Sequence, residues 1–265
     1  MTNRAIVIFD IDGVVRDVGG SYRRALADTV EKYTGGAYRP TMADIDALKG
    51  EGVWNNDWQG SQELVYRYFE SQGKERGRVE LNYEELVEFF QSRYRGTNPN
   101  SWDGYINSEP LLMQSTYLQQ LTDANIGWGF FSGATKGSAE YVLQQRLGLN
   151  NPILVAMEDA PGKPDPTGLF DTIAQVESKN PTLANQPVIY VGDTVADMYT
   201  VVKAQAMKPE RRWLGVGILP PHIHDGGELL ETYSAKLTQA GAVRVFPNVE
   251  YLNPQEIYQL IDPTK

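Results

Sequence analysis

The sequence predicts an α/β protein in which a doubly wound parallel sheet is interrupted by an inserted, all-helical domain. Six short apolar runs, each bounded by turn residues, have the length and composition of buried strands. These runs cover residues 5–9, 127–131, 153–156, 188–191, 214–218 and 243–246. Segments with apolar residues at helical spacing separate most of them. Strands that alternate with helices indicate a parallel sheet covered on both faces, a Rossmann-like core.

Two helix starts are marked by proline. Asp165-Pro166 and Asn253-Pro254 each place a side chain that can cap a helix ahead of a proline at the first helical position. Asn253 and Glu256 also have the spacing of a capping box. We therefore expect helices to begin at Pro166 and at Pro254.

The region between the first and the second predicted strand breaks the alternation. Residues 17–107 contain helical patterns but no convincing strand. We therefore expect two domains: an α/β core formed by residues 1–16 and 108–265, and an all-helical domain formed by 17–107. Ten aromatic residues from Trp54 to Trp102 are expected to supply most of the core of the helical domain.

Composition excludes several classes of function. The formal charge of −10 over 265 residues argues against a nucleic-acid partner, because that binding depends on clustered lysine and arginine. The absence of cysteine excludes disulfides, thiolate metal sites and a cysteine nucleophile. No apolar run approaches the roughly 20 residues of a membrane span, and the first residues lack the pattern of a secretion signal. We expect a cytoplasmic protein with no membrane or nucleic-acid partner.

Carboxylates gather at the ends of two predicted strands. Asp10 and Asp12 follow the first strand, and Asp193 and Asp197 follow the fourth. Since ligands of a parallel sheet bind where the carboxyl ends of its strands converge, these acids are expected at one edge of the sheet. Carboxylates this close repel one another unless a cation is present, and oxygen ligands without histidine or cysteine select Mg²⁺. The sequence therefore predicts a magnesium site.

The same edge carries what phosphoryl transfer requires. An aspartate can attack phosphorus and form an aspartyl-phosphate, which splits the reaction into two easier steps. The site also needs a proton donor for the leaving oxygen, a fixed positive charge, and hydroxyl or N–H donors for the phosphoryl oxygens. Asp12, Lys163 and Ser132 with its neighbour Gly133 supply these groups after the first, third and second strands.

Four motifs, in this order, resemble those of the haloacid dehalogenase superfamily of phosphohydrolases. They are DIDGVV at residues 10–15, FSGA at 131–134, GKPD at 162–165 and GDTVAD at 192–197. The resemblance covers most of the chain, and the helical insert is similar to the cap of the subfamily related to phosphoglycolate phosphatase. It implies a Rossmann-like core with a cap domain and a Mg²⁺-dependent phosphatase that acts on a small phosphorylated metabolite. Phosphoglycolate is favoured as substrate only by analogy.

The resemblance implies a role for each matching residue. Asp10 would attack phosphorus and ligate Mg²⁺, and Asp193 would ligate the metal directly or through water. Asp12 would protonate the leaving group, activate water afterwards and offer its backbone carbonyl to the metal. Asp12 also separates a phosphatase from relatives that cleave carbon–halogen bonds, because those reactions have no alkoxide to protonate.

Further residues complete the expected site. Ser132 and Gly133 would bind the phosphoryl group, and Lys163 would balance the charge of the nucleophile. Asp197 would support either the metal site or Lys163. Arg16, in the first crossing between the domains, is a candidate for contact with a substrate anion, although a plain ion pair at the hinge is favoured over that role.

Other readings of the chain stay open. A phosphosugar mutase on the same scaffold and a non-catalytic protein that binds a phosphorylated metabolite are the alternatives to a phosphatase. The cluster at residues 55–58 is expected to line the substrate pocket, because no helical pattern explains it. His222 and His224 suggest a second metal site, although two histidines one residue apart are more often part of a loop. The protein is expected to be a monomer or a homodimer.

Overall fold

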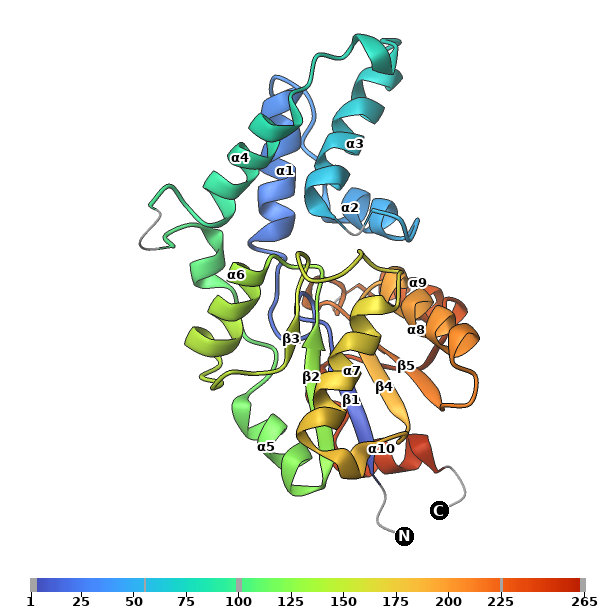
Figure 1. The fold of residues 1–265 in the computed structure, drawn as a ribbon. Coiled ribbons are helices and arrows are strands. Elements are labelled where there is room, and N and C mark those ends of the chain that lie inside the picture. The colour runs from blue at the N-terminus through green and yellow to red at the C-terminus, as the bar shows by residue number, and fades with distance from the viewer. Residues whose placement is uncertain (1–3, 55, 99–101, 225, 263–265) are drawn as a thin grey trace. The chain divides into compact units, whose positions relative to one another are not determined.

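The chain folds into two compact units in the computed structural model, which describes residues 4–54, 56–98, 102–224 and 226–262 (Figure 1). Unit 1 comprises Met1–Asp17 and Leu111–Lys265. Unit 2 comprises Val18–Pro110, and thus interrupts unit 1 after its first strand. Each unit has its own core.

Unit 1 is built on a six-stranded parallel sheet with the order β3-β2-β1-β4-β5-β6. Its strands are β1 (Ala5–Phe9), β2 (Ile126–Phe131), β3 (Leu154–Val155), β4 (Val188–Gly192), β5 (Trp213–Ile218) and β6 (Ala242–Phe246). The order is that of a doubly wound sheet, in which the direction of winding reverses between β1 and β4. The predicted α/β class is confirmed.

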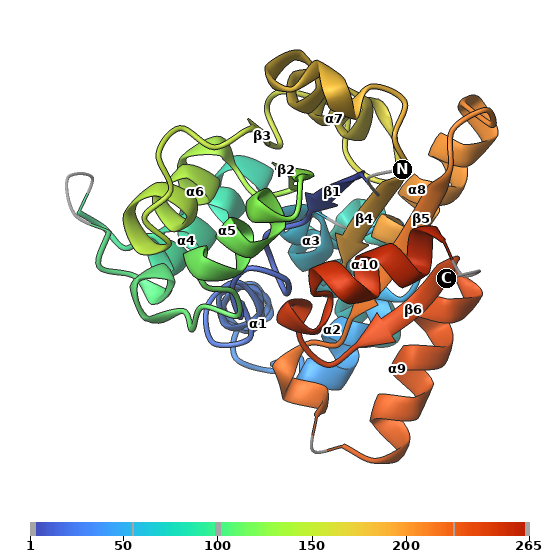
Figure 2. The ribbon, with the colours of Figure 1, turned by 90° about the horizontal axis from the view of Figure 1, so that it is seen from below.

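Helices cover both faces of this sheet (Figure 2). They are α5 (Ser115–Asp123), α6 (Lys136–Glu140), α7 (Thr167–Lys179), α8 (Val195–Met207), α9 (Glu228–Gln239) and α10 (Pro254–Ile261). A π-helical segment, Tyr141–Arg146, continues α6. Within the described part of the chain, no helix has the length and apolarity needed to cross a membrane.

Alternation along β1 explains the two layers. Val7 and Phe9 point into the core shared with α5, α6 and α10, whereas Ile6 and Ile8 point into the core shared with α7 and α8. All five residues of β1 are fully buried. The side chain of Asp10, which follows this strand directly, is therefore attached to a rigid element.

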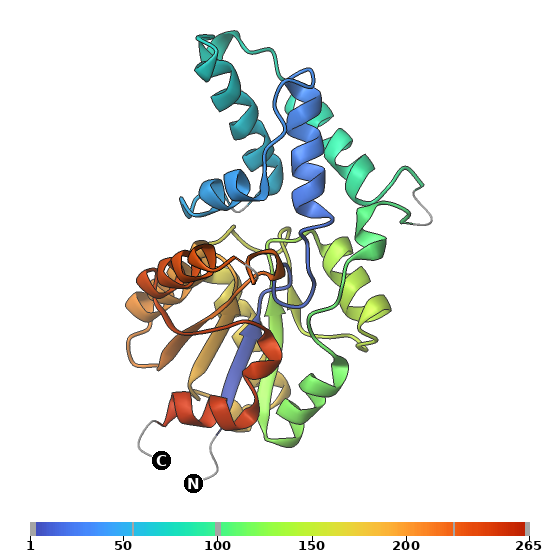
Figure 3. The same ribbon diagram turned by 180° about the vertical axis from the view of Figure 1, so that it is seen from behind.

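The two proline-marked helix starts turn out differently. Asn253 caps α10, because its side chain accepts hydrogen bonds from the N–H groups of Gln255 and Glu256. Pro254 is the first helical residue, as predicted. Figure 3 shows α10 crossing the sheet near the start of β1. The expectation for Pro166 is wrong by one residue, because Asp165 accepts the N–H of Thr167 in a tight turn and α7 begins at Thr167.

The regular secondary structure of unit 2 is helical among its described residues. Its helices are α1 (Tyr22–Tyr33), α2 (Met42–Lys49), α3 (Asp57–Ser71) and α4 (Tyr83–Tyr94), with short 3₁₀ segments at Arg76–Arg78 and Tyr105–Ser108. A buried ion pair joins Arg23 of α1 to Asp46 of α2 at 2.6 Å. The rings of Phe90 and Tyr94 on α4 pack against Tyr22.

One expectation for unit 2 is wrong. Of the ten aromatic residues from Trp54 to Trp102, only Phe90 and Tyr94 are buried. The others are partly exposed and several lie under cations, as Trp102 does beneath Arg95, because aliphatic residues of α1 to α4 fill the interior.

The cluster at residues 55–58 has a helical explanation after all. Asn55 lies outside the described residues. Asn56 is the N-cap of α3, where its side chain accepts the N–H groups of Trp58 and Gln59. Asp57 pairs with Lys49 at 2.8 Å.

Candidate active site

The predicted nucleophile lies at the point where the winding of the sheet reverses. Asp10 follows β1 directly, and its N–H donates to the carbonyl of Val191 in β4 at 2.8 Å. Asp193 follows the end of β4. In open α/β sheets, ligands bind beyond the carboxyl ends of the strands at this switch point. The fold therefore brings together two acids that are far apart in the sequence.

Lys163 links two of the carboxylates. Its Nζ lies 2.9 Å from Oδ2 of Asp10 and donates a hydrogen bond to Oδ1 of Asp197 at 2.6 Å. The side chain of Lys163 is 1% exposed, and its ammonium group lies 5.4 Å from the ring centroids of Phe131 and Tyr190. Low solvent access and aromatic faces strengthen the attraction between these charges.

Asp197 is held by more than the lysine. Oδ2 accepts hydrogen bonds from the N–H and the hydroxyl of Thr194, at 2.9 and 2.6 Å, which completes a capping box at the start of α8. The hydroxyl of Tyr190 lies 3.1 Å from Oδ1. Asp197 thereby joins the start of α8 to Lys163, one of the two placements expected for it.

Sequence reasoning missed Tyr190 and Thr194. Tyr190 stands in the otherwise apolar strand β4, and burial together with the charges of Asp197 and Asp10 raises the pKa of its hydroxyl. The signal available for Thr194 was its spacing of three residues from Asp197, the pattern of a capping box.

The electrostatics show an excess of acid. Burial raises the pKa of Asp10 to about 7, and the charges of Asp197 and Asp12 add to this effect while Lys163 opposes it. Burial disfavours the charged form of Lys163, but Asp10 and Asp197 outweigh burial and raise the pKa of the lysine. In the cluster of Asp10, Asp193, Asp197 and Lys163, two negative charges remain uncompensated when all groups are ionised.

The residues at this edge fit a divalent cation. Carboxylate oxygens of Asp10, Asp193 and Asp197 lie within 4.8 Å of one another, and all three residues are buried. Both oxygens of Asp197 bind Lys163 or Thr194, and the two oxygens of Asp10 likewise bind Lys163 and the N–H of Ile11, so these contacts do not divide the three acids between the lysine and a cation. An all-oxygen set of this charge suits Mg²⁺.

Gly13 makes room for Asp193. A Cβ atom at this position would lie 2.1 Å from Oδ2 of Asp193, and the backbone has a φ of +75°, which favours glycine. The turn after β1 therefore requires glycine for two independent reasons.

Asp12 and Arg16 form an ion pair of their own. Nε of Arg16 donates to Oδ1 of Asp12 at 2.6 Å, and Nη2 lies 2.6 Å from the same oxygen. The Arg16 side chain is fully buried, whereas that of Asp12 is 24% exposed. The structure thus places Arg16 in an ion pair, the role favoured for it over a substrate contact.

Ser132 lies at the same end of the sheet. Phe130 of β2 stands opposite Phe9 of β1, which places Ser132 beyond the sheet edge beside Asp10. Its N–H donates to Val155 at 3.0 Å, and its hydroxyl accepts the N–H of Ala134 at 3.1 Å. This turn holds Ser132 in place, with the partly exposed Gly133 between the two bonded residues.

The histidines belong elsewhere. His222 lies in a 3₁₀ segment, Pro221–Ile223, and Nε2 of His224 is 3.0 Å from the carbonyl oxygen of Leu219. Among the described residues, the cluster of possible metal ligands consists of aspartates and contains neither histidine. Within the described part of the chain, neither histidine therefore belongs to a group of three or more possible metal ligands.

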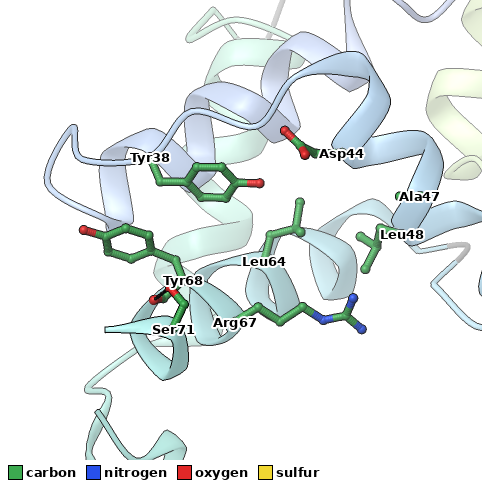
Figure 4. Close-up of a pocket in the computed structure, with 8 residues that line it drawn as sticks. All are labelled: Tyr38, Asp44, Ala47, Leu48, Leu64, Arg67, Tyr68 and Ser71. Atoms are coloured by element: carbon green, nitrogen blue, oxygen red, sulfur yellow. Dashed lines mark hydrogen bonds between the residues drawn. The ribbon is translucent and has the colours of Figure 1, made fainter. Parts of the chain in front are cut away.

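Unit 2 contains a pocket of about 350 Å³ (Figure 4). Its lining residues are Tyr38, Asp44, Ala47, Leu48, Leu64, Arg67, Tyr68 and Ser71. Arg67 already binds Glu51 through two hydrogen bonds and Glu63 through a third. Because this cation is balanced and Asp44 is acidic, the pocket offers little to a phosphate group.

The fold and the acidic cluster define an α/β protein with a charged site at the switch point of its sheet. A model of the haloacid dehalogenase-like hydrolase family matches residues 5–204, and the chain belongs to this family. The resemblance seen in the four motifs is thereby confirmed.

One curated relative is a protein of Phytophthora nicotianae named imidazoleglycerol-phosphate dehydratase. It is 28% identical over 243 residues, which cover 89% of this chain. The match covers 48% of the relative, so the chain spans about half the length of that protein.

Solved structures share the fold. A phosphonoacetaldehyde hydrolase-like protein from Oleispira antarctica has a TM-score of 0.66 at 15% identity, covering all of this chain and 96% of that one. The phosphatase Tt82 from Thermococcus thioreducens has a TM-score of 0.56 at 20% identity. The match covers 76% of this chain and 88% of that one. A proposed β-phosphoglucomutase from Thermotoga maritima has a TM-score of 0.54 at 16% identity. The match covers 99% of this chain and 100% of that one. At these identities the likeness shows the fold alone.

Proposed function

We propose that the chain is a Mg²⁺-dependent phosphatase that hydrolyses a small phosphate monoester through an aspartyl-phosphate on Asp10. The observation that carries this proposal is the buried arrangement of Asp10, Lys163 and Asp197 beside Asp193 at the switch point of the sheet. Membership of the hydrolase family supports the reaction class.

In the first proposed step, the Asp10 carboxylate attacks phosphorus. The bond between phosphorus and the ester oxygen breaks, and Asp12 gives its proton to that oxygen, which leaves as an alcohol. Lys163 offsets part of the negative charge that gathers at Asp10. Ser132 and Gly133 would donate hydrogen bonds to the phosphoryl oxygens.

In the second proposed step, the Asp12 carboxylate takes a proton from water. The resulting hydroxide attacks phosphorus, inorganic phosphate leaves, and Asp10 and the acid form of Asp12 are restored. Asp10 and Asp193 would hold Mg²⁺, which when bound supplies positive charge for the phosphoryl oxygens. Unit 2 is proposed as the cap that excludes water and selects the substrate.

The test measures release of inorganic phosphate from purified full chain, with Mg²⁺ or with a chelator. The panel contains p-nitrophenyl phosphate, phosphoglycolate and imidazoleglycerol phosphate, the last because of the relative's name. We expect Mg²⁺-dependent release that Asp10→Asn lowers by at least about 10³-fold with the fold unchanged by circular dichroism.

Three results would contradict the proposal. Conversion of a sugar phosphate into its isomer without phosphate release would indicate a mutase. Tight binding of a panel compound with no turnover of any would indicate a protein that binds a phosphorylated metabolite without catalysis. Full activity of Asp10→Asn would reject the nucleophile.

A further inference from the structure

The loop after β1 folds back so that Arg16 returns to Asp12. The N–H of Gly13 donates to the carbonyl of Arg16 at 2.9 Å, and the N–H of Arg16 lies 3.2 Å from the carbonyl of Ile11. Arg16 also forms isolated β-bridges with Asp12 and with Leu111. The backbone of both partners is therefore held in place by hydrogen bonds that do not depend on the ion pair.

The side-chain geometry separates two possible roles for Arg16. The guanidinium is fully buried, and the exposed part of the pair is the Asp12 carboxylate. A substrate arriving from solvent would therefore meet the acid rather than the cation. Both nitrogen contacts end on Oδ1 of Asp12, so Oδ2 can exchange a proton while the guanidinium stays in place.

We propose that Arg16 is a positioning residue that holds the Asp12 carboxylate in the orientation from which it exchanges protons with the leaving group and with water. This inference depends on the proposed function, because it concerns the acid–base step of that reaction. The hydrogen bond from Nε and the close contact of Nη2 both end on Oδ1, so two atoms of one rigid, buried plane anchor that oxygen, which a single ammonium group does not reproduce.

Leaving-group dependence tests the proposal. Phenyl phosphate and p-nitrophenyl phosphate have nearly the same size, but phenolate is far more basic and needs a proton as it leaves. We expect Arg16→Gln to lower kcat/KM for phenyl phosphate about tenfold more than for p-nitrophenyl phosphate, because kcat/KM reports the step in which the leaving group departs. Arg16→Lys should show the same selectivity with a smaller loss, because it keeps the charge without the planar fork.

Arg23→Gln is the matched control. Arg23 forms another buried ion pair, with Asp46 at 2.6 Å, but lies in unit 2 and is no part of the proposed acid–base step. Its loss should lower the melting temperature without changing the ratio of kcat/KM between the two substrates. This separates a change in stability from a change in proton transfer.

The outcomes are distinct. If wild type hydrolyses both esters but the ratio is unchanged in folded Arg16→Gln and Arg16→Lys, the positioning role is overturned. A rise in KM alone, equal for both esters, would instead indicate a substrate contact and also overturn it. If Arg16→Gln does not fold, Arg16→Lys decides. Failure of wild type to hydrolyse any ester rejects the proposed function itself.

Discussion

Replacing Lys163 by methionine removes the cation from a buried cluster of acids. The lysine side chain is 1% exposed and contacts Asp10 at 2.9 Å and Asp197 at 2.6 Å, so its loss leaves both carboxylates without this partner. Removing one partner of a buried ion pair typically lowers the free energy of unfolding by about 3–5 kcal/mol. For a unit of this size that corresponds to a drop in melting temperature of about 6–20 °C.

The stability lost in Lys163→Met should depend on pH in a defined direction. The pKa of Asp10 is raised to about 7, above its ordinary value of 3.8, so the folded metal-free protein binds a proton more readily than the unfolded chain. Stability of the metal-free protein therefore falls as pH rises from about 4 to about 7. At pH 5 Asp10 is mostly protonated and therefore neutral, so removing the positive charge of Lys163 destabilises the fold less. The cost of Lys163→Met should be larger at pH 8 than at pH 5.

Thermal unfolding by circular dichroism in the presence of chelator measures this cost at both pH values. Lys136→Met is the matched control, because Lys136 pairs with Asp159 at 3.1 Å but its side chain is 50% exposed. An exposed ion pair contributes little to the free energy of unfolding, because water and salt screen it. The reasoning is refuted if Lys163→Met is no more destabilising than Lys136→Met at pH 8, or if its cost grows on acidification.

Two further predictions concern the metal site. Saturating MgCl₂, compared with NaCl at equal ionic strength, should raise the melting temperature more at pH 8 than at pH 5, because below about pH 7 the metal must displace a proton from Asp10. An equal shift at both pH values would contradict this assignment of Asp10. Gly13→Ala should cost about 1–3 kcal/mol and abolish the MgCl₂ shift, since the new Cβ would meet Asp193 at a left-handed backbone position. Gly162→Ala, with open space around it and no left-handed backbone, is the control, and a full MgCl₂ shift in Gly13→Ala would show that Asp193 is not needed.

The core of unit 1 was predictable because its signals are local. A buried strand such as β1 needs consecutive apolar residues, and an acid placed directly after it must lie at the sheet edge. Since all strands are parallel, acids that follow different strands lie at the same end of the sheet, and those that follow the neighbouring strands β1 and β4 lie close together. This is why Asp10 and Asp193 could be assigned to one site from the sequence.

Short-range signals were also missed or misread. No helical pattern was expected to explain Asn56, although asparagine before a helix is an ordinary N-cap. Pro166 was expected to start a helix, but the turn made by Asp165 delays the start to Thr167. The alternatives in such cases differ by little free energy, and packing selects between them.

The sequence by itself determined the fold class and the acids that line the edge of the sheet, because strand periodicity and strand-end residues are read directly from the order of the chain. The motifs implied that Lys163 balances Asp10, but only the tertiary structure decided which charged atoms are in contact. It placed Lys163 between Asp10 and Asp197, and it turned Arg16 onto Asp12. Pairing depends on distances and burial between segments far apart in the chain or on how a loop folds back, and residue order alone specifies neither.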